Sequence, residues 1–372
     1  MSVPSEPLSR AGKAKTGLMQ WFGGLLVHIA FCLLWTIGGV CVAGTCAMLA
    51  GYTYGLSFAI FGSVTMKHRR SRQAWALACL TLFALSGPRH VVDSGFTRYW
   101  VSWVWLSFSA WIAWFWDFKP RPWFRNCIAN VAKAYYSSCE LRGALSDVEK
   151  GGSLFGFHPH GILAVGFSMQ GVWCKDFHEH AGFDTMHLVD KVLRDDNPYF
   201  KVLCDVHGNI ETLTKESLQA CMRERRNISF IPGGFEDATA MAFGKDRTVM
   251  RRRTGFIKYA LQHGYRVHPV YTFGESSTYR TFTGFVRFRL WLNKFGVPAV
   301  IFFGFPWLPL LPRPQAELTT CVGKAIQMPR IAEPSKEDVE KWHRAYCDAL
   351  EAVFHENKEA AGLPKSATLD VW

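Results

Sequence analysis

A long stretch in the first third of the chain has no charged residues. No Asp, Glu, Lys or Arg occurs between residues 17 and 66. Because a membrane-spanning helix needs about 20 apolar residues, this stretch is long enough for two such helices. It has no polar face that could meet water, which disfavours a buried helical core, and it exceeds the apolar core of a signal peptide, about 7–15 residues. The absence of charge therefore predicts a membrane-embedded helical hairpin.

Basic residues on both sides of this hairpin predict its orientation. Lys13 and Lys15 precede it, and Lys67 and Arg69 follow it. Positively charged flanks favour the cytosolic side, so both ends of the hairpin should lie there. Two further apolar segments, residues 74–85 and 99–116, either lie along the membrane surface or span it, and both arrangements leave the rest of the chain in the cytosol. We therefore expect a disordered cytosolic tail (residues 1–16), membrane-embedded apolar segments (residues 17–116) and a cytosol-facing globular domain (residues 117–372).

Patterns that would identify several other classes of protein are also absent. The 11 cysteines form no C-x-x-C pair and are scattered, as is typical of buried thiols in a reducing compartment. The net charge is +12, but zinc-finger spacing, an RNP-like motif and a basic helix with heptads are missing, so we expect no nucleic-acid partner. The basic charge instead predicts contact with anionic lipid headgroups or with a phosphate-bearing substrate.

Two further kinds of chemistry lack their motifs. His178 and His180 could join His158 and His160 in a metal-binding cluster, but the H-x-x-x-H and H-x-x-H-H boxes of membrane di-iron enzymes do not occur. We therefore expect no metal, and we interpret His178 and His180 as solvated loop residues. The G-x-S-x-G elbow of a serine hydrolase is also missing, which disfavours a hydrolase.

A rigid turn that carries two histidines is the strongest functional signal in the chain. A short apolar run over residues 153–157 predicts a buried strand, and His158, Pro159, His160 and Gly161 follow it directly. Proline fixes one backbone angle, and glycine permits conformations that other residues resist. Two imidazoles are therefore held at a strand end, and imidazole suits proton transfer near neutral pH. Two surface histidines without a function are the alternative that this motif alone leaves open.

A second strand ends in a glycine-rich loop that carries two carboxylates. Residues 227–231 predict a short buried strand, and the loop after it reads Pro232-Gly233-Gly234-Phe235-Glu236-Asp237-Ala238. The glycines would allow close approach of a substrate, and a carboxylate could orient an imidazole. A third predicted strand, residues 266–273, ends in Gly274-Glu275. Three strands that end in such loops predict an α/β fold, with a central sheet, flanking helices and ligands at the carboxyl edge.

Helix signals fill most of the remaining globular part. Residues 162–172 predict a helix whose first N–H groups face the histidine turn, and residues 211–226 predict another, with a helix signal at Thr214. Ser335 and Asp338 form a capping box before the last helix, whose apolar stripe we assign to the core. Residues 126–136 predict an interfacial helix, and residues 281–312 are aromatic and broken by proline, which suits an aromatic wall or a monotopic membrane contact.

Together these motifs resemble the type 2 diacylglycerol acyltransferase family. The resemblance rests on their order over residues 117–360: the His-Pro-His-Gly turn, the Pro-Gly-Gly loop, Arg253-x-Gly255-Phe256-x-Lys258-x-Ala260 and Phe273-Gly274-Glu275. It implies an acyltransferase of the endoplasmic reticulum membrane and lipid droplets that makes triacylglycerol from acyl-CoA and diacylglycerol. Monoacylglycerol or a long-chain alcohol is the alternative acceptor, acyl-CoA is a co-substrate with no further cofactor, and contact with membrane lipids is expected. Self-association is left open.

The resemblance also suggests a mechanism of direct acyl transfer. His160, in preference to His158, would remove the proton from the acceptor hydroxyl, and Asp237 or Glu236 would hold the imidazole tautomer. Backbone N–H groups after Gly161 or at the two glycines of the second loop would stabilise the oxyanion. Arg251, Arg252, Arg253 and Lys258 are expected to bind the CoA phosphates. The other residues expected to contact substrate are Pro159, Gly161, Gly233, Gly234, Phe235, Gly255 and Glu275.

Two weaker interpretations compete with this mechanism. A covalent route would use Cys174 or Cys204, but neither lies in a recognisable nucleophile motif. A lipid-binding or lipid-transfer protein without catalysis would need the apolar hairpin and an aromatic pocket, but not the paired histidine and carboxylate loops. Those two loops therefore favour an enzyme.

Overall fold

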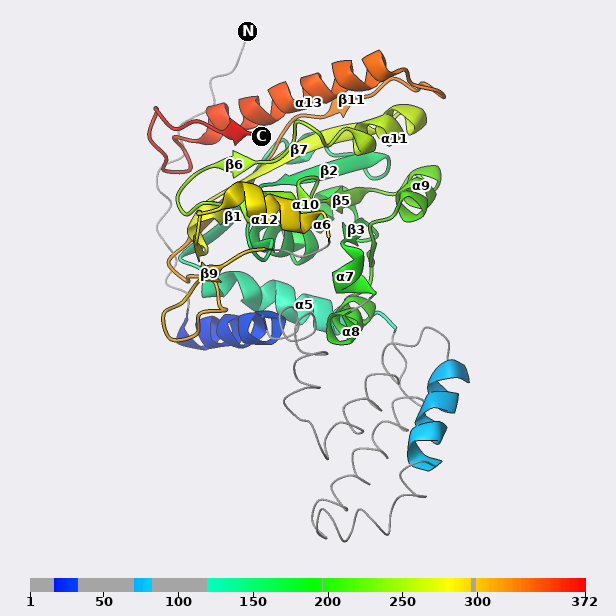
Figure 1. The fold of residues 1–372 in the computed structure, drawn as a ribbon, viewed down its shortest axis with the longest axis vertical. Coiled ribbons are helices and arrows are strands. Elements are labelled where there is room, and N and C mark those ends of the chain that lie inside the picture. Colours follow the sequence, from blue (N-terminus) through cyan, green and yellow to red (C-terminus); the bar gives the residue numbers. More distant parts are fainter. Residues whose placement is uncertain (1–16, 33–69, 82–118, 196, 296–298) are drawn as a thin grey trace.

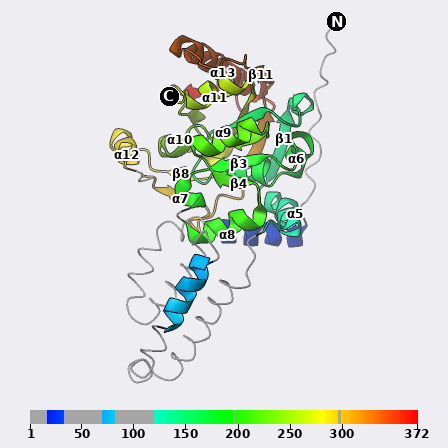
Figure 2. The ribbon, with the colours of Figure 1, turned by 90° about the vertical axis from the view of Figure 1, so that its right-hand side faces the viewer.

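The computed structural model describes residues 17–32, 70–81 and 119–372, apart from residues 196 and 296–298. An eight-stranded sheet lies at its centre with helices on both faces, which confirms the predicted α/β fold (Figures 1 and 2). The strand order is β1-β10-β7-β2-β5-β3-β4, and β11 pairs with β7. The bounds are β1 Ser138–Gly143, β2 Ser153–His158, β3 Met186–Val189, β4 Ile210–Thr212, β5 Ile228–Phe230, β7 Arg266–Phe273, β10 Glu317–Val322 and β11 Ile326–Gln327.

Parallel pairing in the middle of the sheet brings the carboxyl ends of β2, β3, β5 and β7 to one edge. β2 is parallel to both β7 and β5, and β5 is parallel to β3. β10 and β11 are antiparallel to β7, and β1, which is parallel to β10, shares this reversed direction. Since parallel strands end at the same edge, the loops after β2, β5, β7 and β3 meet there. The three strands predicted from sequence are confirmed, and β7 has the predicted bounds.

The two faces of the sheet are covered by different sets of helices. Leu154 of β2 packs into one core and Phe155 and Phe157 into the other, as the two-residue period of a strand requires. The first core includes α9 (Lys215–Arg223), α11 (Gly255–His263) and α13 (Lys336–Asn357). The second includes α5 (Pro122–Val131), η3 (Phe167–Val172), α6 (Lys175–Ala181) and α8 (Pro198–His207).

Two helix starts follow the capping chemistry that the sequence predicts, although the helix expected over residues 211–226 begins only at Lys215, because residues 210–212 form β4. Thr214 caps α9 by accepting from Ser217 N, and Ser335 and Asp338 form a reciprocal capping box at α13. The helix expected over residues 162–172 begins later, because residues 161–163 form a turn, and its second half is a π-helix, η3. The predicted helix over residues 126–136 is α5 followed by a short 3-10 turn.

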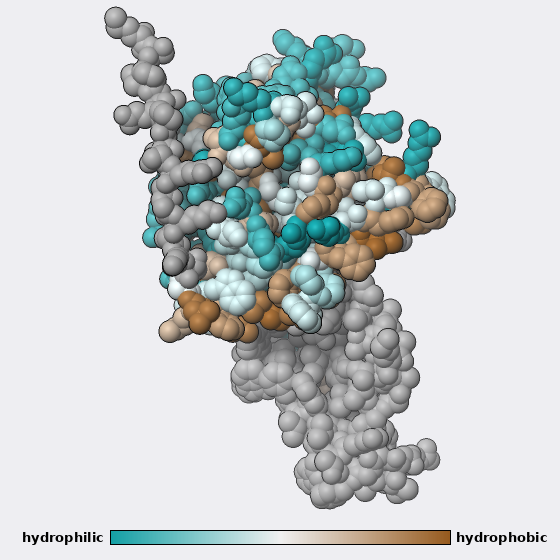
Figure 3. Space-filling view, turned by 90° about the vertical axis from the view of Figure 1, so that its left-hand side faces the viewer, coloured by the Kyte–Doolittle hydropathy of each residue, from teal (hydrophilic) through white to brown (hydrophobic). Residues whose placement is uncertain are grey.

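The remaining elements are short and complete the surface. The helices are α7 (Lys191–Arg194), α10 (Gly234–Ala240) and α12 (Val286–Asn293), and the 3-10 turns are η1 (Ala132–Tyr135), η2 (Leu145–Asp147) and η4 (Glu275–Ser277). β6 (Arg247–Thr248) pairs with β12 (Asp370–Val371), and β8 (Arg280–Thr281) pairs with β9 (Phe302–Phe303). Hydrophobic residues gather on the side of α12 and along the lower edge of the domain (Figure 3).

The described part of the apolar amino-terminal third includes a helix that packs on the globular domain. This helix, residues 18–32, places the ring of His28 4.3 Å from that of Tyr135 and the ring of Phe31 4.9 Å from that of Trp173. No helix within the described ranges is long and apolar enough to cross a bilayer. The predicted tail lies outside the described residues, as do most of the predicted membrane segments.

One prediction about the histidines is wrong. His178 is buried in α6, with one ring nitrogen 3.0 Å from Val172 O and the other 3.3 Å from Gly182 O. Burial lowers the pKa of this imidazole. His180 is exposed as expected, but it lies in the same helix rather than in a loop. This burial could not be predicted, because the helix has only seven residues, too few for a periodic pattern.

Candidate active site

His158 lies behind the histidine turn, within a chain of buried hydrogen bonds. Its Nε2 is 2.9 Å from Tyr346 Oη, and its Nδ1 is 3.0 Å from Thr248 Oγ1. Thr248 Oγ1 donates in turn to Asp237 Oδ2 at 3.2 Å. One direction of donation satisfies every partner: the tyrosine hydroxyl donates to Nε2, and the Nδ1–H donates to the threonine. Burial lowers the pKa of His158 to about 3, so the imidazole is neutral with both nitrogens occupied.

Asp237 accepts a hydrogen bond from the backbone of the histidine turn and, among the described residues, makes none with an imidazole ring. Its Oδ2 accepts from the backbone N–H of His160 at 2.8 Å, and its Oδ1 accepts from Val249 N at 3.2 Å. Burial raises the pKa of this carboxyl to about 6, while these donors and the hydroxyl of Thr248 oppose the shift. At neutral pH the ionised carboxylate therefore ends the hydrogen-bond chain and holds the turn in place. The other expected carboxylate, Glu236, pairs with Arg253 at 2.9 Å.

His160 is half-buried and has a ring nitrogen available for chemistry. Its Nδ1 is 2.9 Å from the carbonyl oxygen of Gly161. Since a carbonyl only accepts, Nδ1 carries the proton and Nε2 presents a lone pair. The tautomer is thus set by a backbone carbonyl, where the sequence predicted a carboxylate. Burial lowers the pKa of His160, and the negative charge of Asp190 opposes that shift, so the imidazole is unprotonated at neutral pH.

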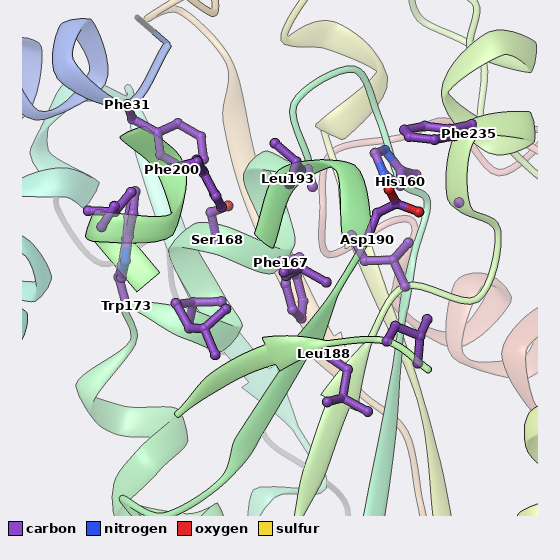
Figure 4. Close-up of a pocket in the computed structure, with 18 residues that line it drawn as sticks. Phe31, His160, Phe167, Ser168, Trp173, Leu188, Asp190, Leu193, Phe200 and Phe235 are labelled. Carbon is purple, nitrogen blue, oxygen red and sulfur yellow. The ribbon is translucent and has the colours of Figure 1, made fainter. Parts of the chain in front are cut away.

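An apolar pocket opens beside His160 (Figure 4). It encloses about 850 Å³, its open mouth included, which lies within the range of ligand-binding pockets. Its polar side chains are few: those of His160, Ser168 and Asp190. The remaining lining is mostly aliphatic and aromatic and includes Phe31, Phe167, Trp173, Leu193, Phe200 and Phe235. Such a cavity suits a long hydrocarbon group whose polar end lies at His160.

Glu275, which the sequence predicts to bind substrate, contacts the backbone of the protein itself. It is fully buried, and its carboxyl oxygens accept from Val165 N at 3.1 Å and from Gly166 N at 2.6 Å. Gly161 is required there, because a Cβ at this position would lie 1.9 Å from Oε1 of the glutamate. Two of the N–H groups after Gly161 that we expected to stabilise an oxyanion, those of Val165 and Gly166, are therefore bound by Glu275. The N–H groups of Gly233 and Gly234, at the start of α10, have no partner within that helix and stay the predicted donors.

The buried carboxyl of Glu275 should make stability depend on pH. Burial raises its pKa from 4.5 to about 8, against the effect of its two backbone donors. The folded state then binds the proton more tightly than the unfolded state, so the contribution of this group to stability falls as pH rises from 4.5 to about 8. Urea unfolding in detergent should show the stability gap between wild type and Glu275→Gln narrowing over that range. The exposed Glu333→Gln serves as control, and a constant gap for Glu275→Gln would contradict the shift.

The basic residues expected to bind CoA phosphates are only partly gathered at the site. Arg253 approaches the second loop, with Nη2 3.4 Å from Gly233 O in addition to its ion pair. Arg251, Arg252 and Lys258 are exposed around the start of α11, where Gly255 is the first residue. They form a basic surface beside the loop, and their role stays a prediction. Cys174 and Cys204 are both buried, and burial raises the pKa of Cys204 to about 12, which disfavours a thiolate there.

Comparison with known proteins connects this site to a family. Residues 96–372 match the family model described as diacylglycerol acyltransferase. The chain belongs to the diacylglycerol acyltransferase family. It is 31% identical to human acyl-CoA wax alcohol acyltransferase 2 (58% of this chain, 68% of that one) and 27% identical to bovine 2-acylglycerol O-acyltransferase 1 (79% and 92%). It is 27% identical to human diacylglycerol O-acyltransferase 2, over 59% of this chain and only 60% of that protein's length.

Family membership confirms the resemblance, but the sequence missed three residues of the site. Tyr346 was assigned to the core stripe of α13, and it does lie in the core, where its hydroxyl also reaches His158. Thr248 lies in the short strand β6, which had no sequence signal. Asp190 follows β3, so it reaches the same sheet edge as the predicted loops. The only sequence signal for Asp190 was the short apolar run of residues 186–189 directly before it.

Proposed function

We propose that this protein is an O-acyltransferase that transfers a fatty acyl group from acyl-CoA to diacylglycerol and forms triacylglycerol. The observation that carries the proposal is the unprotonated Nε2 of His160 beside a largely apolar pocket. A general base needs a free lone pair and a pKa near or below the working pH, and this imidazole meets both conditions. His158 meets neither the first condition nor the requirement of access to the pocket.

The proposed reaction is direct transfer in one site. His160 Nε2 takes the proton of the acceptor hydroxyl while the hydroxyl oxygen attacks the thioester carbonyl carbon. The first N–H groups of α10 stabilise the negative oxygen of the tetrahedral intermediate. When the carbon–sulfur bond breaks, the sulfur of CoA takes the proton from the imidazolium, so the products are an ester and free CoA. The negative charge of Asp190 favours the protonated form of His160, so it stabilises the transient positive charge on the imidazole.

The two ends of acyl-CoA would bind different surfaces. The acyl chain enters the apolar pocket, and the exposed Arg251, Arg252 and Lys258 attract the phosphates together with Arg253. No cofactor is needed, since the thioester itself drives the transfer. The proposal retains the expected location at the endoplasmic reticulum membrane, with the domain on the cytosolic side, and contact with lipid droplets. Exposed aromatic side chains of the α12 region, among them Phe285, Phe288 and Trp291, support contact with lipid.

The acceptor is the least constrained part of the proposal. Relatives are named for diacylglycerol, 2-acylglycerol and wax alcohol as acceptors, so the names of relatives do not choose among them. Acyl transfer to monoacylglycerol or a long-chain alcohol is therefore the second candidate, and its chemistry at His160 would be the same. A lipid-binding protein without catalysis is disfavoured by the free Nε2 at the pocket.

An acyl-transfer assay in membranes tests the proposal. Membranes from a host that makes no triacylglycerol, with the full chain expressed, would receive labelled oleoyl-CoA and one acceptor each: diacylglycerol, monoacylglycerol or a fatty alcohol. We expect labelled triacylglycerol from wild type and from His180→Ala, an exposed histidine in α6, but not from His160→Ala. Label in another ester would change the acceptor and keep the chemistry. No product from any acceptor, with folded protein present, would refute the proposal.

A further inference from the structure

A second cavity lies against the helix of residues 18–32. It encloses about 400 Å³, its open mouth included, and is lined by Ile29 and Cys32 of that helix and by the four residues Leu308 to Leu311. Phe31, on the same helix, lines the pocket beside His160. One helix therefore contributes to the walls of two separate apolar spaces, and the proposed reaction accounts for only one of them.

The outer wall of this second cavity has no free carbonyl to offer a ligand. Leu308 O accepts from Leu311 N, Pro309 O from Gly304 N and Leu311 O from Phe305 N, each at 2.8 Å. Leu310 O accepts from Tyr279 Oη at 2.9 Å. All four carbonyls of the lining segment are thus bound within the protein, and the side chains are hydrocarbon. A polar ligand would lose its hydration without compensation, so the cavity suits only a hydrocarbon chain.

The cavity also adjoins the catalytic turn and the lipid-facing surface. Cys32 and Leu311 pack in one buried cluster with Ile162 and Leu163, which directly follow His160-Gly161 in the chain. On the outside, Trp307 is 85% exposed and Leu308 is 47% exposed. In Figure 1, the segment after β9 descends to the helix of residues 18–32 at the lower edge of the domain.

We propose that this cavity binds one acyl chain of the lipid acceptor. The inference rests on the proposed function, which gives the first pocket to the acyl chain of acyl-CoA. Diacylglycerol brings two further chains that must leave water or the bilayer while its hydroxyl reaches His160. The second cavity has apolar walls and an apolar rim and lies behind the histidine turn, so it can take up one of these two chains. The nucleotide part of CoA is too polar for it, and the donor chain already has a pocket.

Photolabelling tests the site without depending on turnover. The full-length His160→Ala protein, purified in detergent, would be irradiated with diacylglycerol that carries a diazirine midway along one chain. We expect label in peptides that contain Ile29 or Leu310, and competition by excess dioleoylglycerol. Ile29→Trp or, on the opposite wall, Leu310→Trp should reduce that label about tenfold, the effect of removing about two methylene groups from an apolar site. Leu26→Trp, on the exposed face of the same helix, should not reduce it.

Steady-state kinetics then assign the chain to the acceptor. Ile29→Trp in the otherwise wild-type chain should lower kcat/KM for dioleoylglycerol about tenfold, while dibutyrylglycerol and oleoyl-CoA keep theirs within about twofold. An equal loss with the short-chain acceptor, or a loss confined to oleoyl-CoA, would overturn the inference. So would label that the tryptophan variants do not reduce, as expected if another part of the chain or a second copy fills the cavity. Specific label in a wild-type protein without acyl transfer would support the chain site and refute the proposed function.

Discussion

Replacement of His160 by alanine is expected to lower turnover by at least about 10²-fold, the usual contribution of a positioned general base. The protein should remain folded, because the imidazole is half-buried and, within the described part of the chain, its ring bonds only to the carbonyl oxygen of Gly161. The free energy of unfolding should therefore change by no more than about 1 kcal/mol. Single-turnover acyl transfer with purified protein measures the first effect, and thermal unfolding in detergent measures the second.

The pH dependence of kcat/KM gives this prediction a second readout. Burial lowers the pKa of His160 below its ordinary 6.5, so activity should fall on the acid side only below that value. Asp190→Asn removes the charge that opposes the shift, and the acid limb should move to still lower pH. If the acid limb does not move in Asp190→Asn, the carboxylate of Asp190 does not influence the pKa of the catalytic base. Near-normal turnover in folded His160→Ala would exclude His160 as the base.

The sequence predicted the skeleton of the site better than its contacts. Strand ends were predictable because short apolar runs stop at proline and glycine, and the loops after β2, β5 and β7 do meet at one sheet edge. Which side chains touch depends on pairing between distant segments. The bond between His158 and Tyr346 joins residues that are 188 positions apart, and a tyrosine in an apolar helical stripe looks like any core residue.

For the acidic residues, too, the sequence predicts their position near the site but not the groups that they contact. Sequence placed Glu275 and Asp237 at the site correctly, because both follow strand ends. It could not show that the two carboxyl groups face backbone N–H groups on the buried side of the turn. That geometry follows from the close approach of Gly161 to Glu275, and a motif of residue types does not contain it. The predicted site residues that line the pocket are His160, Gly234 and Phe235, and they stand in the same motifs as residues that only support them.

His158→Ala is expected to lower the stability of the fold, in contrast to the neighbouring His160→Ala. The alanine would remove the bonds that Tyr346 Oη and Thr248 Oγ1 make to the imidazole. The two hydroxyls would keep only their longer bonds, to Gly156 O at 3.4 Å and to Asp237 Oδ2 at 3.2 Å, and each lost bond costs about 0.5–1.5 kcal/mol. The space left by the imidazole adds a cavity cost, so the total loss should reach about 3 kcal/mol or more. Thermal unfolding in detergent should show it as a lowered Tm, and lost activity should follow the loss of folded protein.

Tyr346→Phe provides the matched comparison, because it removes one hydroxyl and leaves the packing of α13 in place. It should cost about 1–3 kcal/mol, less than His158→Ala, since only Nε2 of the imidazole loses its donor. If His158 instead served as the base, its alanine variant would keep wild-type stability and lose turnover, as His160→Ala is expected to do. The two histidines of the turn thus have opposite signatures: one variant should lose the reaction and the other the fold, because one nitrogen lone pair is free and the other is committed to the core.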